Sequence, residues 1–295
     1  MEQTPPRAMS GAALPAAYLT AQTSSFTDFL RAEAPHLLPG RRGGWGGEEP
    51  VQARRQPSEL TPAPPHGTTI VALTFDGGVL IAGDRRATSG NMIAQRDMEK
   101  VFVTDDYSAV GIAGTAGIAV DIVRLYTLDL LHYEKIEGVS LSLDGKTNKL
   151  AALVKGNLDV AMAGLAVLPL FVGFDTAATD PSRAGRIVSY DVVGGRYEER
   201  SGFHSVGSGS VFARSALKKL YDPGSDVATA THHAVEALYD AADDDTATGG
   251  PDLARKIYPS IITITAAEGA VHLPEDRVAE FTESVVTART SQPRG

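Results

Sequence analysis

The sequence predicts an α+β domain in which helices cover antiparallel sheets, preceded by an arm without a core. Strand patterns come in a group, helix patterns follow in a group, and strands then return, unlike the strict alternation of a parallel sheet. Short turns rich in Gly or Asp join neighbouring strand patterns, as in hairpins. Ten of the 17 prolines lie within residues 5–65, and the first clear strand pattern starts only at Thr68.

Residues 1–67 are expected to be largely disordered, because Pro, Gly and Ala dominate and no periodicity is present. Residues 25–32 are an exception, since Phe26, Phe29 and Leu30 would share one side of a short amphipathic helix. Such a helix would dock on another surface, although a fraying linker explains the segment equally well.

Two hairpins and two helices are expected at the start of the domain. A strand pattern over residues 69–76 turns at Gly77-Gly78 and returns over 79–84, and a second hairpin joins 100–104 to 108–114. Helices are predicted over 115–135 and about 146–165. The apolar positions that bury the first helix are Ile118, Val120, Ile122, Val123, Leu125 and Leu128.

The second half of the domain is expected to continue with strands, then helices, then strands again. The predicted strands cover 168–174, 186–191 and 196–206, and the predicted helices cover 211–221 and 226–243. A strand over 260–266 has a short partner near Val271, and a last helix begins at residue 274.

Bulk composition excludes several classes of protein. No run approaches the ~18 to 20 apolar residues that cross a bilayer, and the N-terminus lacks the features of a secretion signal, so no membrane partner is expected. The net charge of −9 falls entirely on the domain, because residues 1–67 hold six Arg and six Asp or Glu. Nucleic acid is therefore disfavoured as a partner. The absence of cysteine excludes disulfides and a Cys nucleophile and fits a cytoplasmic protein.

The glycines of residues 111–117 lie between a predicted strand and a predicted helix, where a dinucleotide could bind. Their spacing is G-x-x-G-x-x-G, and no strand ending in an acidic residue follows about 20 residues later. The preceding strands also pair as hairpins rather than as a βαβ unit. Glycines at this kind of turn equally allow another backbone, such as a bound peptide, to come close.

Other common catalytic signatures are absent from the sequence. The string around Ser208 is neither a nucleophile elbow nor a phosphate loop, and the seven histidines show no metal-binding spacing, so no metal or cofactor is expected. The acidic run of residues 240–245 ends a helix, where negative charge opposes the helix dipole. This run is a candidate functional feature, with a solvated helix end as the simpler explanation.

Thr68 remains as a candidate nucleophile. A threonine hydroxyl needs a base, and an α-amino group with a pKa near ~7.7 to 8.0 can act as one if Thr68 becomes the N-terminus. This chemistry requires removal of residues 1–67, a nearby cation and a carboxylate that holds the cation. Asp84 ends the second strand and Lys100 begins the third, so both can project toward Thr68. The simpler alternatives are an ordinary strand residue for Thr68 and surface hairpin charges for the other two.

Several blocks of sequence occur together in one order and at compatible spacings, and together they resemble a proteasome core-particle (20S) β-subunit of the actinobacterial type. The resemblance covers nearly all of residues 68–295, whereas the arm resembles the family's propeptides in kind only. The blocks are Thr68-Thr69-Ile70-Val71, Gly83-Asp84-Arg85-Arg86-Ala87-Thr88, Lys100, Gly111-Ile112-Ala113-Gly114-Thr115, Gly207-Ser208-Gly209-Ser210 and Asp245-Thr246-Ala247-Thr248-Gly249-Gly250.

The resemblance implies a threonine endopeptidase with the four-layer αββα sandwich of N-terminal nucleophile hydrolases. Residues 1–67 would be a propeptide that the chain removes by cutting itself between Gly67 and Thr68, and residues 68–295 the catalytic domain. The partners would be a ring of proteasome α-subunits, further β-subunits in two stacked seven-membered rings, a ring-shaped AAA+ ATPase and unfolded protein substrates. No cofactor is implied.

The resemblance also assigns roles to individual residues. Thr68 would be the nucleophile, with its freed amine as the base, and Lys100 paired with Asp84 would lower the pKa of that amine. The remaining catalytic positions would be Ser208, Asp245 and Thr248, which orient the amine and its water, and Gly114, whose N–H forms the oxyanion hole. A structural β-subunit without activity would lack Thr68, Asp84 or Lys100, and all three are present.

The specificity pocket implied by the resemblance is apolar. An acidic or basic preference would need a buried counter-charge, so we expect cleavage after large apolar residues. The backbone at Thr88, Gly114 and Ala116 would pair with the substrate as an added strand. The sequence departs from the family pattern at two places. One is Thr248, where many relatives carry Ser, and the other is Arg85-Arg86-Ala87 beside the pocket. The pocket residues would be Ala87, Met98, Phe102, Ile112, Ala116 and Val120.

Overall fold

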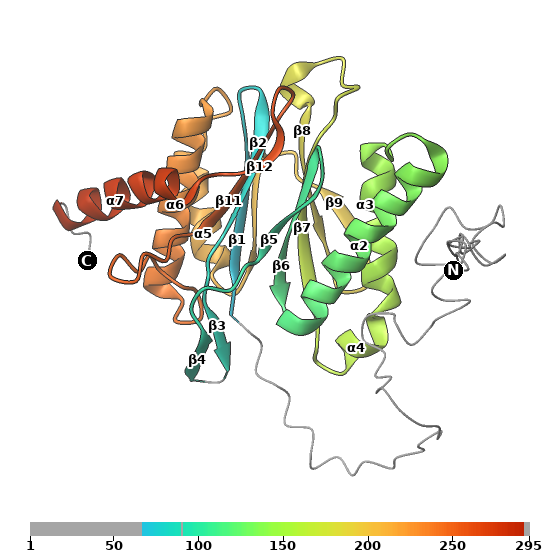
Figure 1. Cartoon of the computed structure of the whole chain (residues 1–295). Coiled ribbons are helices and arrows are strands. Elements are labelled where there is room, and N and C mark those ends of the chain that lie inside the picture. The colour runs from blue at the N-terminus through green and yellow to red at the C-terminus, as the bar shows by residue number, and fades with distance from the viewer. Residues whose placement is uncertain (1–66, 90, 292–295) are drawn as a thin grey trace, which may run out of the picture.

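The computed structural model describes residues 67–89 and 91–291. The predictions for the arm, including the short helix at residues 25–32, lie outside the described residues. The α+β class predicted from the sequence is confirmed, because the described residues form antiparallel sheets with helices packed on them (Figure 1).

Two five-stranded antiparallel sheets form the centre of the domain, and a two-stranded sheet extends from one end. The first sheet has the order β10 (Phe203–Gly207), β1 (Thr69–Phe75), β2 (Gly78–Gly83), β11 (Ser260–Thr265), β12 (Gly269–His272). The second has the order β5 (Val101–Asp105), β6 (Ser108–Gly114), β7 (Val167–Phe174), β8 (Gly185–Tyr190), β9 (Arg196–Glu198).

The two large sheets pack face to face through alternate side chains of their strands. Ile70 and Ile81 of the first sheet and Leu170 of the second are fully buried in one apolar cluster between them. Gly111 lets the sheets come close, because a Cβ there would lie 2.6 Å from Cγ2 of Ile70. The start of β1 is thereby held against the second sheet.

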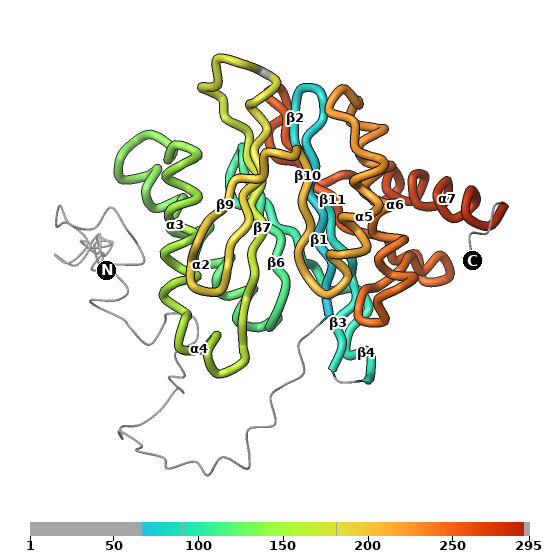
Figure 2. The backbone as a smooth tube through the Cα atoms, turned by 180° about the vertical axis from the view of Figure 1, so that it is seen from behind, coloured from blue at the N-terminus to red at the C-terminus, as the bar shows by residue number. Residues whose placement is uncertain are grey.

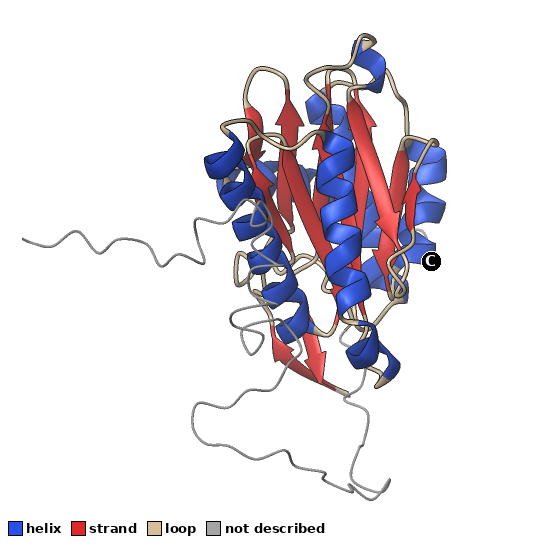
Figure 3. Cartoon of the chain, turned by 90° about the vertical axis from the view of Figure 1, so that its right-hand side faces the viewer, coloured by secondary structure: helices blue, strands red, loops and turns tan. Residues whose placement is uncertain are grey.

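Helices cover the outer faces of both sheets (Figure 3). Tyr126 of α2 (Ala116–Glu137) and Leu150 of α3 (Leu143–Gly156) pack in one apolar cluster with strands of the second sheet. The first sheet is covered by α5 (Ser210–Leu220) and α6 (Val227–Asp244), with α7 (Glu275–Ser291) packed beside α6. Among the described helices, none is long and apolar enough to span a membrane.

One predicted helix was wrong in its extent. Residues 146–165 form two helices, α3 and the short α4 (Leu158–Met162), and α3 starts earlier because Ser142 caps it by accepting a hydrogen bond from the Gly145 amide. The break falls at Asn157, whose side chain bonds back to the Leu153 carbonyl at 2.9 Å. The predicted burial of Leu128 was also wrong, since this side chain is exposed.

The single strand predicted over residues 196–206 was wrong as well. The segment forms β9 in the second sheet and β10 in the first, because the chain turns at Gly202 with a φ of 81° and crosses between the sheets (Figure 2). The hairpin of β3 (Ala87–Ser89) and β4 (Met92–Gln95) was not predicted. It extends at the end of the molecule where β1 begins (Figure 1).

Candidate active site

Thr68 lies directly before β1 and is almost completely buried, with 4% of its surface exposed. Its backbone is held by the loop after β10, since the Ser208 amide donates to the Thr68 carbonyl at 2.9 Å and the Thr68 amide donates to Oγ of Ser208 at 3.3 Å. Its hydroxyl donates to the carbonyl oxygen of Gly67 at 2.7 Å. The nucleophile candidate therefore touches the peptide group that precedes it.

Asp84 is brought beside Thr68 by the register of the first hairpin. Ile70 pairs with Gly83, so the residue after β2 lies next to the residue that starts β1. One carboxylate oxygen accepts hydrogen bonds from the Thr69 amide and from Nζ of Lys100, both at 2.8 Å. The other accepts from the amides of Arg86 at 2.9 Å and Gly249 at 2.8 Å. Four donors fix this buried carboxylate in place.

Lys100 comes from the opposite sheet, immediately before β5, and 3% of its side chain is exposed. Its Nζ donates to Oδ1 of Asp84, to the carbonyl of Arg86 at 2.5 Å and to the carbonyl of Gly67 at 3.5 Å. Burial lowers the pKa of Lys100 because it disfavours the ammonium, and the attraction of Asp84 offsets this only in part. The positive charge of Arg86 adds to the lowering of this pKa.

Asp245 follows α6 and joins two hydroxyl groups that are far apart in the sequence. Its Oδ2 accepts hydrogen bonds from Oγ of Ser208 at 2.5 Å and from Oγ1 of Thr248 at 2.6 Å. Partial burial by itself raises the pKa of Asp245, but the hydrogen bonds from Ser208 and Thr248 outweigh this effect and the pKa is lowered. The acidic run at the end of α6 thus ends in a carboxylate with specific partners.

Gly114 ends β6 in a conformation that suits only glycine. Its φ is 112°, and a Cβ would lie 2.2 Å from the carbonyl oxygen of Ala166. Because β6 pairs antiparallel with both β5 and β7, the glycines of residues 111–117 do not belong to a dinucleotide-binding βαβ unit. In the described ranges 67–89 and 91–291, no group of three or more His, Asp or Glu side chains is placed to hold a metal ion.

Comparison with known proteins identifies the family to which this chain belongs. The sequence model of the family described as "Proteasome subunit" matches residues 65–252. This chain belongs to the proteasome-subunit family. The protein named "Proteasome subunit beta" from Saccharomonospora viridis is 66% identical over 299 residues, covering 99% of each chain. The protein of the same name from Saccharopolyspora erythraea is 68% identical, covering 97% of this chain and 96% of its own. The resemblance to actinobacterial proteasome β-subunits is confirmed.

Three of the residues predicted to form the specificity pocket of this proteasome subunit lie together in the structure. Phe102, Ile112 and Val120 pack in one apolar cluster. Ala87 is buried, whereas Met98 and Ala116 are half-buried. The neighbouring Thr88 accepts a hydrogen bond at Oγ1 from the Gly67 amide at 3.2 Å, so it contacts the residue that precedes Thr68.

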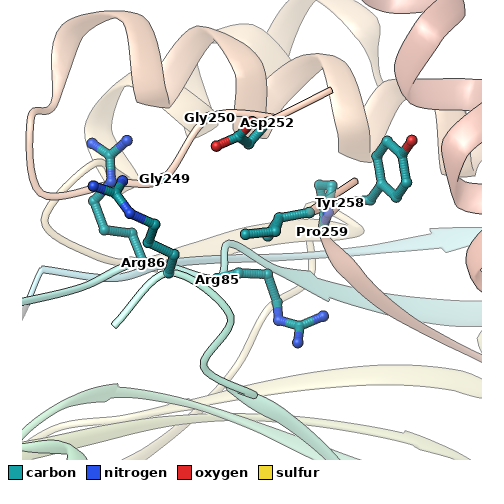
Figure 4. A pocket seen from close by; sticks show the side chains of 9 residues that line it. Arg85, Arg86, Gly249, Gly250, Asp252, Tyr258 and Pro259 are labelled. Atoms are coloured by element: carbon teal, nitrogen blue, oxygen red, sulfur yellow. The ribbon is translucent and has the colours of Figure 1, made fainter. Parts of the chain in front are cut away.

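Sequence reasoning assigned no role to two residues of the site, Thr69 and Gly249. Thr69 links the two halves of the site, because its Oγ1 lies 2.7 Å from Oγ1 of Thr248 and accepts from the Gly209 amide at 3.0 Å. Gly249 approaches the Asp84 segment closely, since a Cβ on Gly249 would lie 2.7 Å from Cβ of Arg86 (Figure 4). Gly67, which was predicted as the residue before the cut, is equally constrained, with 1.9 Å between such a Cβ and Cβ of Ala247. The adjacent Gly249-Gly250 pair was the one signal that could have indicated this close approach.

Proposed function

We propose that this chain is the precursor of a catalytic proteasome β-subunit, a threonine endopeptidase that activates itself by cutting between Gly67 and Thr68. Residues 1–67 are then a propeptide, and residues 68–295 a catalytic domain with the αββα sandwich of N-terminal nucleophile hydrolases. One observation carries the proposal. Oγ1 of Thr68 lies 2.7 Å and Nζ of Lys100 lies 3.5 Å from the carbonyl oxygen of Gly67, so a hydroxyl and a basic side chain both contact the peptide bond that we propose is cut.

Self-cleavage in this arrangement is an N-to-O acyl shift followed by hydrolysis. Oγ1 of Thr68 adds to the carbonyl carbon of Gly67, the C–N bond breaks, and the Thr68 nitrogen takes up the proton that Oγ1 loses. Water then cleaves the ester, which leaves a carboxylate on Gly67 and a free amine on Thr68. Lys100 stabilises the negative charge on the carbonyl oxygen during the first step because its ammonium already faces that atom.

Cleavage of substrates uses the amine that self-cleavage releases. The amine accepts the proton of Oγ1 as the oxygen attacks the scissile carbonyl, and it returns a proton to the departing peptide nitrogen. Water then hydrolyses the acyl-threonine ester. Lys100, held by Asp84, keeps the pKa of the amine low through its positive charge.

The remaining site residues support these two reactions. Ser208 already binds the Thr68 nitrogen and is itself bonded to Asp245, which also binds Thr248, so the three can orient the freed amine and its water. The Gly114 amide is assigned to the oxyanion hole, a role typically worth ~3 to 4 kcal/mol of the barrier. Backbone at Thr88, Gly114 and Ala116 pairs with the substrate as an added strand.

The substrate class follows from the apolar pocket and from the family. Ala87, Met98, Phe102, Ile112, Ala116 and Val120 offer no charge, so the preferred P1 residue is large and apolar. Two stacked rings of seven β-subunits, capped by α-subunit rings, would confine the site in the cytoplasm. A ring-shaped ATPase would deliver unfolded protein chains to it.

Intact mass of the chain before and after mixing with its α-subunit tests the proposal. We expect loss of residues 1–67 and a new N-terminal Thr68, together with peptidase activity. Thr68→Ser keeps the hydroxyl and should still be cut, whereas Thr68→Ala should stay full length and inactive. Peptidase activity from an uncut wild-type chain would contradict the mechanism.

A second variant tests the close packing around the cut bond. Gly67→Ala places a Cβ against Ala247, and the nearest atoms include backbone atoms at 2.7 Å that cannot move aside easily. We expect self-cleavage to slow by at least about tenfold, since misplacing reacting atoms by about 1 Å can cost 10²-fold. His66→Ala changes the preceding position and serves as the control, and this variant should be cut at the normal rate.

A further inference from the structure

Arg85 holds a single peptide group, the one between Asp97 and Met98, at both of its polar atoms. Its guanidinium Nη2 donates to the carbonyl of Asp97 at 2.7 Å. Its own carbonyl accepts a hydrogen bond from the Met98 amide at 2.9 Å. Two opposite contacts from one residue fix both the position and the plane of this peptide group.

The segment of Asp84 and Arg85 and the segment of residues 97–100 are also joined by the Asp84–Lys100 ion pair. Arg85 follows Asp84, and Lys100 comes two residues after Met98, so the Asp84–Lys100 ion pair links the segments at one side and Arg85 links them at the other. Arg85 and Arg86 send their side chains in opposite directions from adjacent positions (Figure 4). Among the described residues, the Arg85 guanidinium has its hydrogen bond with the Asp97 carbonyl and its ion pair with Glu99.

Met98 depends on this contact more than the other predicted walls of the pocket do. Phe102 and Ile112 belong to strands and Val120 belongs to a helix, so regular backbone hydrogen bonds hold them. Met98 lies in the segment between β4 and β5, outside regular structure. Its backbone is positioned by Arg85.

We propose that Arg85 is a positioning residue that fixes Met98 and thereby sets the preference of the enzyme for large over small apolar P1 residues. The inference rests on the proposed function, because Met98 is assigned to the specificity pocket there. Without the guanidinium the Asp97–Met98 peptide group keeps only the hydrogen bond from the Met98 amide to the carbonyl of residue 85. The peptide group can then tilt about that single contact, and the Met98 side chain is no longer held in one position.

The hydrogen bond to Asp97 carries this role, and the nearby carboxylate of Glu99 contributes less. Nη2 of Arg85 lies 4.0 Å from Oε2 of Glu99, and both side chains are partly exposed, so this ion pair is weak. Nε of Arg85 and Oε1 of Glu99 are buried, and neither has a hydrogen-bond partner among the described residues. The carbonyl of Asp97 is thus the anchor of the guanidinium.

The test compares Arg85→Gln with wild type in the assembled, self-cleaved particle. We expect the ratio of kcat/KM for a Leu-P1 peptide to that for an Ala-P1 peptide to fall about tenfold, mainly through KM of the Leu peptide, since pocket contacts of this size discriminate by about 10- to 200-fold. Arg85→Lys should lie in between. Glu99→Gln should change the ratio less than about twofold. Arg277→Gln, which removes an exposed ion pair on α7, should leave the ratio unchanged.

Hydrogen exchange provides a readout that does not need activity. In uncut Thr68→Ala chains, the Met98 amide should exchange about tenfold faster when Arg85 is also changed to Gln, because local opening becomes easier. An unchanged P1 ratio with equal loss on both peptides, or an unchanged Met98 exchange rate, would overturn the proposal. If the wild-type particle cleaves neither peptide, the proposed function fails, while the exchange result still decides whether Arg85 holds Met98.

Discussion

Two buried lysine–aspartate pairs in this domain have the same chemistry and the same separation of charged atoms, yet they differ in what surrounds them. Lys100 pairs with Asp84 at 2.8 Å beside Thr68, and Lys146 of α3 pairs with Asp105 at the end of β5 at 2.8 Å. The exposed fractions of the side chains are 3% and 0% in the first pair and 7% and 17% in the second. Distance and burial alone would not tell which pair belongs to the proposed active site.

The Lys146 pair joins elements of the fold to one another. Lys146 belongs to α3 and Asp105 ends β5, and the Asp105 carboxylate also accepts a hydrogen bond from the Tyr107 amide at 2.9 Å. The backbone carbonyl of Lys146 accepts from the Tyr126 hydroxyl of α2 at 3.1 Å. These contacts fasten α2 and α3 to the β5–β6 turn, which is a structural role.

Lys100 also contacts a group outside the Lys100–Asp84 pair. Nζ of Lys100 also faces the carbonyl of Gly67, and the pKa of Lys100 is lowered because burial outweighs the attraction of Asp84. The charge is therefore held at a net cost to folding. A buried ion pair indicates a functional role when its burial costs folding free energy and when one of its donors also faces a group that is proposed to react.

Removing each lysine should separate the two roles most sharply. We expect Lys100→Met to abolish self-cleavage and to lower peptidase activity at least about 10³-fold, because the charge that stabilises the transition state is lost. Lys146→Met should keep activity within about twofold and should destabilise the chain by about 2 kcal/mol, below the range for a fully buried pair. Intact mass, peptide turnover and urea unfolding measure these effects. Equal losses of activity in both variants would remove the distinction.

Replacing each aspartate by asparagine should give a smaller contrast in the same direction. All four hydrogen bonds at Asp84 come from donors, so an amide group in place of this carboxylate would oppose at least one donor whichever way it turns. We expect Asp84→Asn to lower activity about 10²-fold and stability by about 3 kcal/mol. Asp105→Asn keeps its contact with the Tyr107 amide and should cost about 1 kcal/mol with normal activity. Peptide turnover and urea unfolding measure both variants, and a more stable Asp84→Asn than Asp105→Asn would contradict this account.

The sequence predicted the part of the site that local register determines. Asp84 lies beside Thr68 because the two residues flank one hairpin, which the strand pattern and Gly77-Gly78 turn already indicate. Lys100 comes from the other sheet, and Ser208 and Asp245 come from loops after β10 and α6. Their convergence depends on how the two sheets stack, and periodicity holds no information about that. The strand pattern allowed Lys100 to project toward Thr68, whereas only the family resemblance added Ser208 and Asp245.

The errors in the fold have similar physical origins. Gly156-Asn157 and Ser201-Gly202 are turn signals that were present but were outweighed by the apolar and β-branched residues around them. Helix periodicity could not predict that Leu128 is exposed. The apolar stripe of α2 is wider than the surface that packs on the sheet, and periodicity predicts burial for the whole stripe. The link from Thr69 to Thr248 joins residues 179 apart in sequence and could not be read from either segment.

The smallest expected difference concerns pH and tests whether Lys100 is held at a cost. Its folded pKa is lowered, so the folded chain binds this proton more weakly than the unfolded chain, whose lysine pKa is ~10.4. The cost is fully present below the folded pKa and is relieved as pH rises from there toward the unfolded value. In the uncut Thr68→Ala background, the unfolding free energy of the chain with Lys100 should therefore rise with pH relative to that of the Lys100→Met chain. The rise should be about 1.4 kcal/mol for each unit by which the pKa is lowered. Urea unfolding at several pH values between neutrality and the pKa of a free lysine measures the difference in unfolding free energy between the two chains. A difference that stays constant or falls with pH would mean that Asp84 fully compensates the burial of Lys100.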